Sequence, residues 1–399
     1  MSTVTLEPYR RVLAHQGLRR ALVIGALVRT PVFATGILVS IHVVTALGRS
    51  YTEAGLVAAA ATISIAISGP WRGRLLDKHG LRRVVAPSLL ISGTSWAIAP
   101  WVGYLPLLVL VVVAGLFVVP TFSVIRQAII AAVPEDQRRT AISLDSAIIE
   151  VCFMVVPAVA VWASIHWGTA KVLFVVQMCG VAAGVALWIA NPPLRGKGED
   201  AAGAEAPPRR TWLRPGFIAV CAIAATSTLV LAGSDLAIVA TMREFDTVGQ
   251  IGIVLAVWGL GSLVGGLVYG ALPREIPARW LLLGLALATA PMALASSPWE
   301  LAGYALLAGL LCAPAITATV DEAARLVPAR ARGEAMGWHG SSITAGGALG
   351  APFAGLALDG YGHGAGFVAV AAVGVAVALW SFVVARRSTA REARVASRV

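Results

Sequence analysis

Long apolar stretches separated by short polar segments set the pattern of this chain. A helix needs about 20 apolar residues to cross a bilayer, and uncharged runs of that order recur from near residue 21 to near residue 385. We therefore expect twelve membrane-spanning helices. Their approximate bounds are 21–48, 52–72, 84–101, 104–125, 140–165, 172–192, 215–242, 247–272, 280–298, 300–320, 335–358 and 362–385.

Two boundaries in this pattern need an argument of their own. Residues 84–125 carry no charge, which is too long for one crossing, and Pro100, Gly103 and Pro106 predict a tight reversal between two helices. Residues 1–18 are polar, and no small-residue cleavage site follows a short apolar core. We therefore expect no cleaved signal peptide.

Composition excludes an ordinary soluble enzyme. The 399 residues are 58% hydrophobic and 13% charged, whereas soluble domains are about 45–50% apolar and 25% charged. The four cysteines lie in apolar runs and form no CxxC pair, so no disulfide framework or zinc site is expected. No HExxH, GxSxG or phosphate-loop motif is present. We expect no enzymatic activity, metal or cofactor.

Basic residues predict the orientation. With the N-terminus placed on one side, 27 of the 31 Lys and Arg fall on that side, including the 72–83 loop and the C-terminal tail. The positive-inside rule then places both termini in the cytoplasm of a multi-pass protein of the cell (inner) membrane. The net charge of +11 follows helix ends and forms no continuous patch, so nucleic acid is not an expected partner.

The sequence also repeats itself. A shift of 194 residues aligns Ala114-Gly115-Leu116 with Ala308-Gly309-Leu310, and Pro120 with Pro314, without a gap. We expect an all-α membrane protein of two six-helix bundles in the same orientation, 1–191 and 215–399, the second ending in the basic tail. The segment 192–214, rich in Pro, Ala, Gly and charge, is expected to be a flexible cytoplasmic linker.

One loop carries a family resemblance. The segment from Gly69 to Arg83 reads GPWRGRLLDKHGLRR, which resembles the cytoplasmic loop signature of the major facilitator superfamily, roughly G-x-L-a-D-r-x-G-r-k. The residues that carry it are Gly73, Leu75, Asp77, Lys78, Gly80 and Arg82; Leu81 stands where a basic residue is usual, and Arg82 and Arg83 are candidates to replace it.

The resemblance implies a conformational latch made of Gly69, Gly73, Asp77, Lys78, Gly80, Arg82 and Arg83. In physical terms, the two helix glycines permit close helix approach. Asp77 is placed to lie against the positive end of a helix from the other half. A solvated turn whose cations only set topology is the alternative.

Spans 4–5 and 10–11 resemble a bacterial branch of that superfamily related to multidrug and sugar exporters. Gly115 to Pro120 with Arg126, and Gly309 to Pro314 with Glu334 and Trp338, carry this resemblance. The family's antiporter signature in span 5 is reduced here to Pro157. The branch implies efflux without fixing the substrate.

Charges inside predicted spans are the functional candidates, because a charge at the bilayer centre costs at least about 2.5–3.5 kcal/mol. Glu150 and Asp235 are candidates for proton coupling or substrate contact. Asp145 is a weaker candidate, with Arg126 as a possible structural partner. Arg29 either binds an anionic group or neutralises one of these acids. Burial favours the neutral form of a carboxyl, so such acids suit proton exchange, and they also suit a cationic substrate.

Gly346 and Gly350 in span 11 are spaced for close helix packing.

The leading functional prediction is a proton-coupled secondary transporter that exports a small amphipathic organic compound by alternating access. An uptake symporter for a sugar or metabolite is the alternative within the class, and a membrane scaffold or receptor-like protein is the alternative outside it. The resemblance implies a monomer whose partners are a small-molecule substrate, protons and the lipid bilayer.

Overall fold

The computed structural model describes residues 7–194, 207–247 and 250–396, and these residues are predominantly helical. Eleven of the helical segments are long and apolar enough to span a membrane, and a shorter apolar segment, Ala278–Leu294, is a twelfth. The helices are α1 (Glu7–Ala14), α2 (Gln16–Ile41), α3 (Tyr51–His79), α4 (Leu81–Ile98), α5 (Tyr104–Leu116), α6 (Thr121–Ala132), α7 (Arg138–Trp167), α8 (Thr169–Ala190), α9 (Arg209–Trp212), α10 (Pro215–Glu244), α11 (Ile251–Ala271), α12 (Ala278–Thr289), α13 (Pro298–Leu326), α14 (Arg332–Tyr361) and α15 (Ala365–Ala396).

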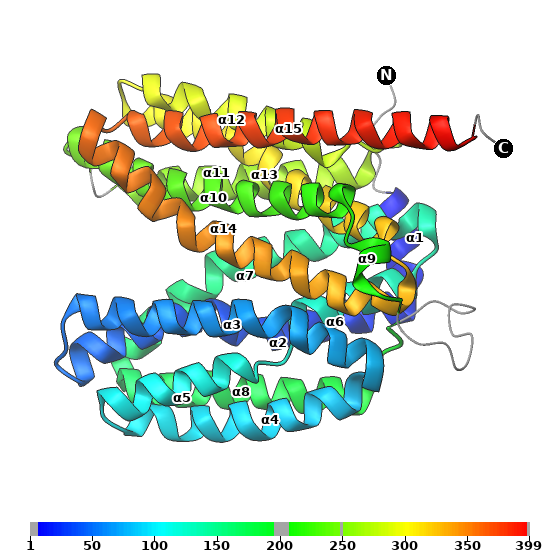
Figure 1. The fold of residues 1–399 in the computed structure, drawn as a ribbon. Coiled ribbons are helices and arrows are strands. Elements are labelled where there is room, and N and C mark those ends of the chain that lie inside the picture. The colour runs from blue at the N-terminus through cyan, green and yellow to red at the C-terminus, as the bar shows by residue number, and fades with distance from the viewer. Residues whose placement is uncertain (1–6, 195–206, 248–249, 397–399) are drawn as a thin grey trace.

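The helices assemble as two bundles, and Figure 1 shows α2–α8 and α10–α15 on opposite sides of the molecule. The expected all-α fold of two six-helix bundles is confirmed. The repeat extends to the element bounds: α7 and α14 begin and end at positions that differ by 194 residues. The short helices that precede them, Glu135–Gln137 and Ala329–Ala331, are offset by the same number. The two halves are therefore structural copies.

The fourth span departs from the sequence-based expectation of one helix over 104–125. The helix α5 ends at Leu116, and α6 begins at Thr121 and continues to Ala132. Pro120 lies between them; it lacks a backbone N–H, and it disfavours helical backbone at the preceding residue. The β-branched Val118 and Val119 before it add to this effect because they lose side-chain freedom in a helix.

Glycine makes several of the helix reversals possible. Gly80 between α3 and α4, Gly168 between α7 and α8, and Gly362 between α14 and α15 all have positive φ, at 77°, 83° and 89°. Residues with a Cβ rarely adopt that conformation. Gly168 and Gly362 are again 194 positions apart, so the turn chemistry is duplicated together with the helices.

The two halves converge at one end. Figure 1 shows α14 crossing toward α3 near α9, and α7 crossing toward α11, whereas the far ends of the bundles diverge. Residues 195–206 of the expected linker lie outside the described residues. The remainder includes the short helix α9, whose Trp212 is buried and packs its ring 5.3 Å from that of Phe217. This part of the linker is thus anchored on α10.

Candidate functional site

A seam of glycines joins α3 of the first half to α14 of the second. A Cβ at Gly69 would lie 2.5 Å from the Ser341 hydroxyl and 2.9 Å from the Gly337 carbonyl oxygen. A Cβ at Gly73 would lie 2.9 Å from the Gly333 carbonyl carbon. Gly333 and Gly337 face Gly73 and Gly69 in return. Because neither helix has side chains at these points, the two backbones touch.

Asp77 closes the end of this seam. Its two carboxylate oxygens accept hydrogen bonds from the backbone N–H groups of Gly333 at 2.8 Å and Glu334 at 2.7 Å. These groups belong to the first turn of α14, where N–H groups have no partner within the helix and the helix dipole is positive. Asp77 thereby caps a helix of the other half.

The remaining residues of the loop motif have separate positions. Gly80 makes the α3–α4 turn, and Lys78 and Arg83 are exposed beside it. Arg82 stays within the first half: its guanidinium donates to the carbonyl groups of Trp188 and Ile189 at 3.3 Å and lies over the Trp188 ring. Arg82 therefore ties α4 to the end of α8.

Glu334 adds a negative charge to the seam. The sequence indicated it only as part of the exporter resemblance and predicted no ion pair for it. Its carboxylate pairs with Arg209 of the linker and lies 3.8 Å from the Arg74 guanidinium. One acidic residue at the start of α14 therefore contacts both α3 and α9. Its place in the first turn of α14, which begins at Arg332, is where an acidic residue suits the helix dipole.

A second seam joins α7 of the first half to α11 of the second. The Thr140 hydroxyl donates to the Gly270 carbonyl at 2.6 Å, and the Tyr9 hydroxyl donates to the Leu267 carbonyl. Tyr9 lies on α1, outside the spans, and burial raises its pKa to about 12 although Arg139 acts in the opposite direction. Its hydroxyl consequently remains a donor at a higher pH than that of an exposed tyrosine.

Two of the candidate acids, Glu150 and Asp235, lie farther along the same seam, toward the end where the bundles diverge. The Glu150 carboxylate on α7 accepts a hydrogen bond from the Ser262 hydroxyl on α11 at 2.6 Å. Asp235 on α10 lies close enough for its carboxyl to interact electrostatically with Glu150. Both acids are partly buried. The structure thus brings Glu150 and Asp235, from different halves, into one acidic region.

The other two charged candidates neutralise each other. The Arg29 guanidinium lies 2.5 Å from the Asp145 carboxylate, and their side chains are 1% and 3% exposed. The sequence suggested Arg126 as the partner of Asp145, and this suggestion was wrong as to the direct ion pair. The five-residue offset between Asp145 and Glu150 turns Asp145 toward α2, while Glu150 faces α11.

Arg126 instead contacts the second half. Its guanidinium lies 3.1 Å from Nδ1 of His339 on α14, and Nε2 of that ring lies 2.9 Å from the Thr319 hydroxyl on α13. The Phe122 ring lies between two cations, 4.8 Å from the Arg29 guanidinium carbon and 5.8 Å from that of Arg126. Two buried cations, one of them paired with Asp145, therefore lie against one aromatic ring.

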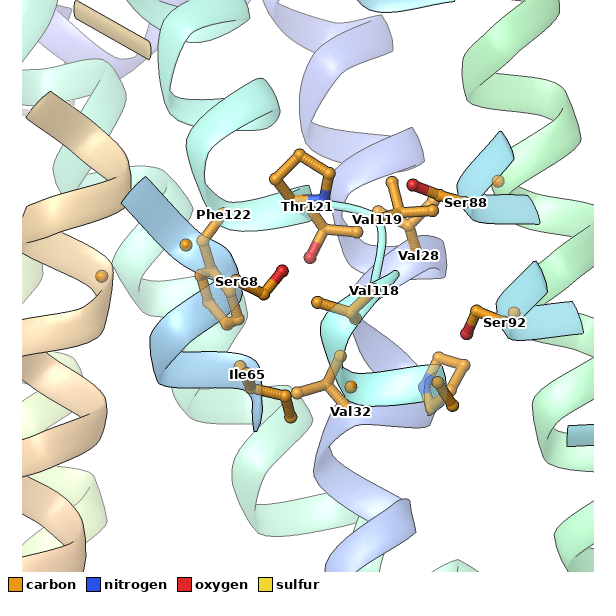
Figure 2. A pocket seen from close by; sticks show the side chains of 18 of the residues that line it. Val28, Val32, Ile65, Ser68, Ser88, Ser92, Val118, Val119, Thr121 and Phe122 are labelled. Carbon is orange, nitrogen blue, oxygen red and sulfur yellow. The ribbon is translucent and has the colours of Figure 1, made fainter. Parts of the chain in front are cut away.

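A cavity of about 300 Å³ adjoins this group inside the first half. Its walls come from α2, α3, α4, α5, α6 and α8, and α14 closes one side. Figure 2 shows the break between α5 and α6 crossing the cavity, with Val118, Val119 and Thr121 at the break. Nothing in the apolar pattern of the fourth span predicted this hollow.

Gly346 and Gly350 lie where α14 meets α10. A Cβ at Gly346 would come within 2.5 Å of the Thr228 hydroxyl, and one at Gly350 within 2.5 Å of the Leu229 carbonyl oxygen. These glycines therefore let α14 pack closely within its own half.

Within the described ranges, no group of three or more His, Cys, Asp or Glu side chains is arranged to hold a metal ion.

Comparisons with solved structures give the same architecture. The human organic anion transporter MFSD10 superimposes with a TM-score of 0.67 at 16% identity, covering 93% of this chain and 99% of that one. The proton:xylose symporter XylE gives 0.68 at 12% identity, covering 92% and 94%. A bacterial homologue of the iron transporter ferroportin, in an outward-facing state, gives 0.70 at 15% identity, covering 92% and 98%.

Sequence comparison identifies the family. No curated protein sequence matches this chain. The family model described as Major Facilitator Superfamily matches residues 21–240 and again residues 217–398, which together span nearly the whole chain. The two matches also correspond to the two structural copies. This chain therefore belongs to the Major Facilitator Superfamily, and it is a multi-pass membrane transporter.

Proposed function

We propose that this protein is a proton-coupled secondary transporter that exports a small amphipathic organic compound. The observation that carries the proposal is the contact between Glu150 and Ser262 across the two halves, with the carboxyl of Asp235 beside it. A hydrogen bond to an ionised carboxylate is about twice as strong as one between neutral groups. Protonation of Glu150 therefore weakens a contact that holds the halves together.

A second carboxyl lies within electrostatic reach of Glu150. Glu150 and Asp235 repel each other when both are ionised, so a proton on either relieves that repulsion. Proton uptake and movement of the halves are thereby linked at one place. Under the orientation expected from the basic residues, the converged end is cytoplasmic and the diverging end faces outward. Alternating access then requires both seams to open.

Export rests on the resemblance of spans 4–5 and 10–11 to exporters, and uptake by symport is the alternative. Relatives in fold include both an organic anion transporter and a proton:xylose symporter. Under the export proposal the protein works as a monomer in the cell membrane, with one substrate-binding region and protons as the coupling ion. Glu150 and Asp235 are the proposed proton carriers, and Arg29 and Asp145 form a structural pair.

The test uses inside-out vesicles with an acidic lumen and a dye that reports lumenal pH. Naphthalene-based cationic, neutral and anionic compounds are added in turn. We expect one class to trigger proton release, and Glu150→Gln or Asp235→Asn to abolish it. Asp359→Asn, which changes an exposed carboxyl on α14, is the matched control and should release protons normally.

Two results would contradict the proposal. Proton release that survives in both variants would remove Glu150 and Asp235 as the coupling residues. No proton release with any compound, from protein of unchanged thermal stability, would favour uptake. Accumulation of the same compounds driven by an inward proton gradient in right-side-out vesicles would then establish symport.

A further inference from the structure

The cavity beside the broken fourth span has the features of a binding site. It is separate from the acidic region of Glu150 and Asp235, since neither residue lines it. Its volume of about 300 Å³ lies at the lower end of the range for small-molecule sites. The features of its lining indicate which chemistry it accepts.

The break exposes the start of a helix to the cavity. The first residues of α6, Thr121, Phe122 and Ser123, all line it. The N-cap position is Pro120, and α6 has no side-chain cap. The first N–H groups of a helix have no acceptor within the helix, and they favour an anion. The twelve-residue α6 therefore presents a positive end to the cavity.

A buried charge adds to this effect. Arg126 lines the cavity and is only 6% exposed. In the group of Arg29, Arg126 and Asp145, the Asp145 carboxylate neutralises Arg29, whereas the Arg126 guanidinium contacts the ring of His339. A cation inside the membrane-spanning region is costly without a counter-charge. The group consequently has one positive charge in excess.

Ser68 supplies an independent sign of a ligand. Its side chain is fully buried and lines the cavity, and within the described part of the chain its hydroxyl has no hydrogen-bond partner. Figure 2 shows Ser68 on α3 and Thr121 on α6 turned toward the cavity. A buried hydroxyl without a partner carries a free-energy cost that a polar ligand group would remove.

The rest of the lining is apolar. Its apolar side chains come from several helices and include Val32, Ile65, Val111 and Trp96. Such walls accept an apolar body through the hydrophobic effect. A site with one cationic end and apolar walls selects an amphipathic anion.

We propose that this cavity binds a small organic monoanion with an apolar body, its anionic group held by Arg126 and the first turn of α6 and reached by the Ser68 hydroxyl. The inference names the substrate class for the transport function proposed above, and it rests on that function to this extent. Because α14 forms one wall, separation of the halves moves that wall and changes access to the bound molecule.

The experiment measures binding alone. The purified protein in nanodiscs of zwitterionic lipid is titrated by calorimetry with 2-naphthoate, 2-naphthamide and 2-naphthylmethylammonium at one pH. These probes share their apolar body and differ in charge. We expect naphthoate to bind at least about tenfold more tightly than the other two, since a charge-assisted hydrogen bond is stronger than a neutral one. Empty nanodiscs correct for partition into lipid.

Variants assign the selectivity to residues. Arg126→Gln should bring the naphthoate dissociation constant close to that of naphthamide, whereas Arg126→Lys should retain part of the difference. Ser92→Phe, which fills the cavity, should weaken naphthoate and naphthamide equally. Arg10→Gln removes an exposed arginine on α1 and controls for net charge. It should leave all three constants unchanged.

Several outcomes would overturn the inference. These are equal affinity for naphthoate and naphthamide, a preference for the ammonium probe, no binding of any probe, or an unchanged affinity ratio in a folded Arg126→Gln protein. Binding at equal pH requires no proton coupling. Anion binding without proton release in the vesicle assay would therefore reject the proposed function alone, and proton release without selective anion binding would reject this inference alone.

Discussion

The fourth span of the first half and its copy in the second half begin and end at the same points of the repeat, and they differ in between. Residues 104–132 form α5 and α6 with a break between them, whereas residues 298–326 form the continuous helix α13. Both contain the repeat's proline, Pro120 or Pro314. Proline alone therefore does not break the span. The preceding pair differs: Val118-Val119 is β-branched, and Cys312-Ala313 is not.

The helices that pack beside these spans, α3 and α11, also differ at one position. A shift of 197 residues aligns Gly69 and Gly73 of α3 with Gly266 and Gly270 of α11, and it then places Ser68 opposite Gly265. A Cβ at Gly265 would lie 2.6 Å from the Leu310 carbonyl carbon, so α11 packs on the α13 backbone. Ser68 instead borders the cavity. The change from a closely packed helix pair, α11 and α13, to a pair that borders a cavity, α3 with α5 and α6, thus coincides with serine in place of glycine at one position.

The two seams also differ in how they close. At the converged end of the molecule, Asp77 caps α14 with a charged group, while the α7–α11 seam is joined there by the neutral hydroxyls of Thr140 and Tyr9. Hydrogen bonds to charged groups contribute about 1.5–3 kcal/mol and neutral ones about 1 kcal/mol. We therefore expect the α3–α14 seam to be the stronger one at that end.

The largest loss of stability is expected from a large side chain at the packed position, Gly265 on α11. Gly265→Leu places a side chain against the backbone of α13 and should cost about 3 kcal/mol or prevent folding, because there is no space to relax into. Ser68→Leu faces the cavity and should change stability by less than about 1 kcal/mol. Denaturant unfolding of both purified variants measures the difference. Equal losses of stability would mean that the two sites are packed alike.

The next effect compares the seams. Asp77→Ala removes both capping hydrogen bonds and should shift the equilibrium between open and closed seams by about 2 kcal/mol, roughly 30-fold. Thr140→Val, similar in shape, should shift it by about 1 kcal/mol. Distances between spin labels on α3 and α14 report the closed fraction. A shift with Asp77→Ala no larger than that with Thr140→Val would show that the capping charge is unimportant.

A smaller effect is expected from repairing the break. Replacing Val118, Val119 and Pro120 together with alanine should favour one continuous helix and weaken naphthoate binding about tenfold, or about 1.4 kcal/mol. Hydrogen exchange should show new protection of amides over 117–121. The matched variant, Pro314→Ala in α13, should leave binding unchanged. Protected amides with full naphthoate affinity would separate the break from the binding site.

The smallest effect concerns Tyr9. Its pKa is raised to about 12 by burial, so the folded protein keeps the phenol proton above pH 10, where an exposed tyrosine loses it. The stability contributed by this group is complete below pH 10 and is lost as the pH rises from 10 toward 12. Closure of the α7–α11 seam should weaken over that range. Tyr9→Phe should cost about 1 kcal/mol at neutral pH and abolish this pH dependence; an unchanged pH dependence would assign it to another group.

Much of the fold was predictable because apolar length, basic loops and an ungapped repeat all report on the membrane. The twelve spans follow from those features, and the family resemblance follows from the loop motif of residues 69–83. The break at 117–120 was not predictable from the proline, since Pro314 occupies the equivalent place in a continuous helix. The local difference is Val118-Val119 in place of Cys312-Ala313. It coincides with a difference between neighbours that are distant in sequence, Ser68 and Gly265, whose contacts appear only after packing.

The sequence predicted the types of residue in the candidate site better than it predicted which residues contact each other. Asp77 could be placed against a helix of the other half because its chemistry suits a helix start. The partner of Asp145 was misassigned because Arg29 and Arg126 both lie at compatible depths, and only the rotation of α2 and α6 decides between them. His339 and Ser262 carry no charge pattern of their own, so sequence gave them no special status.

The glycine seam has a consequence for the speed of the motion. Where Gly69 and Gly73 meet Gly333 and Gly337, the backbones of the two halves are in direct contact, and the Ser341 hydroxyl donates to the Ala66 carbonyl beside them. The four glycines have no side chains to withdraw when the halves separate. The barrier to opening is then set by a few hydrogen bonds, chiefly those of Asp77 and Ser341. Such a joint can be both close-fitting at rest and quick to release.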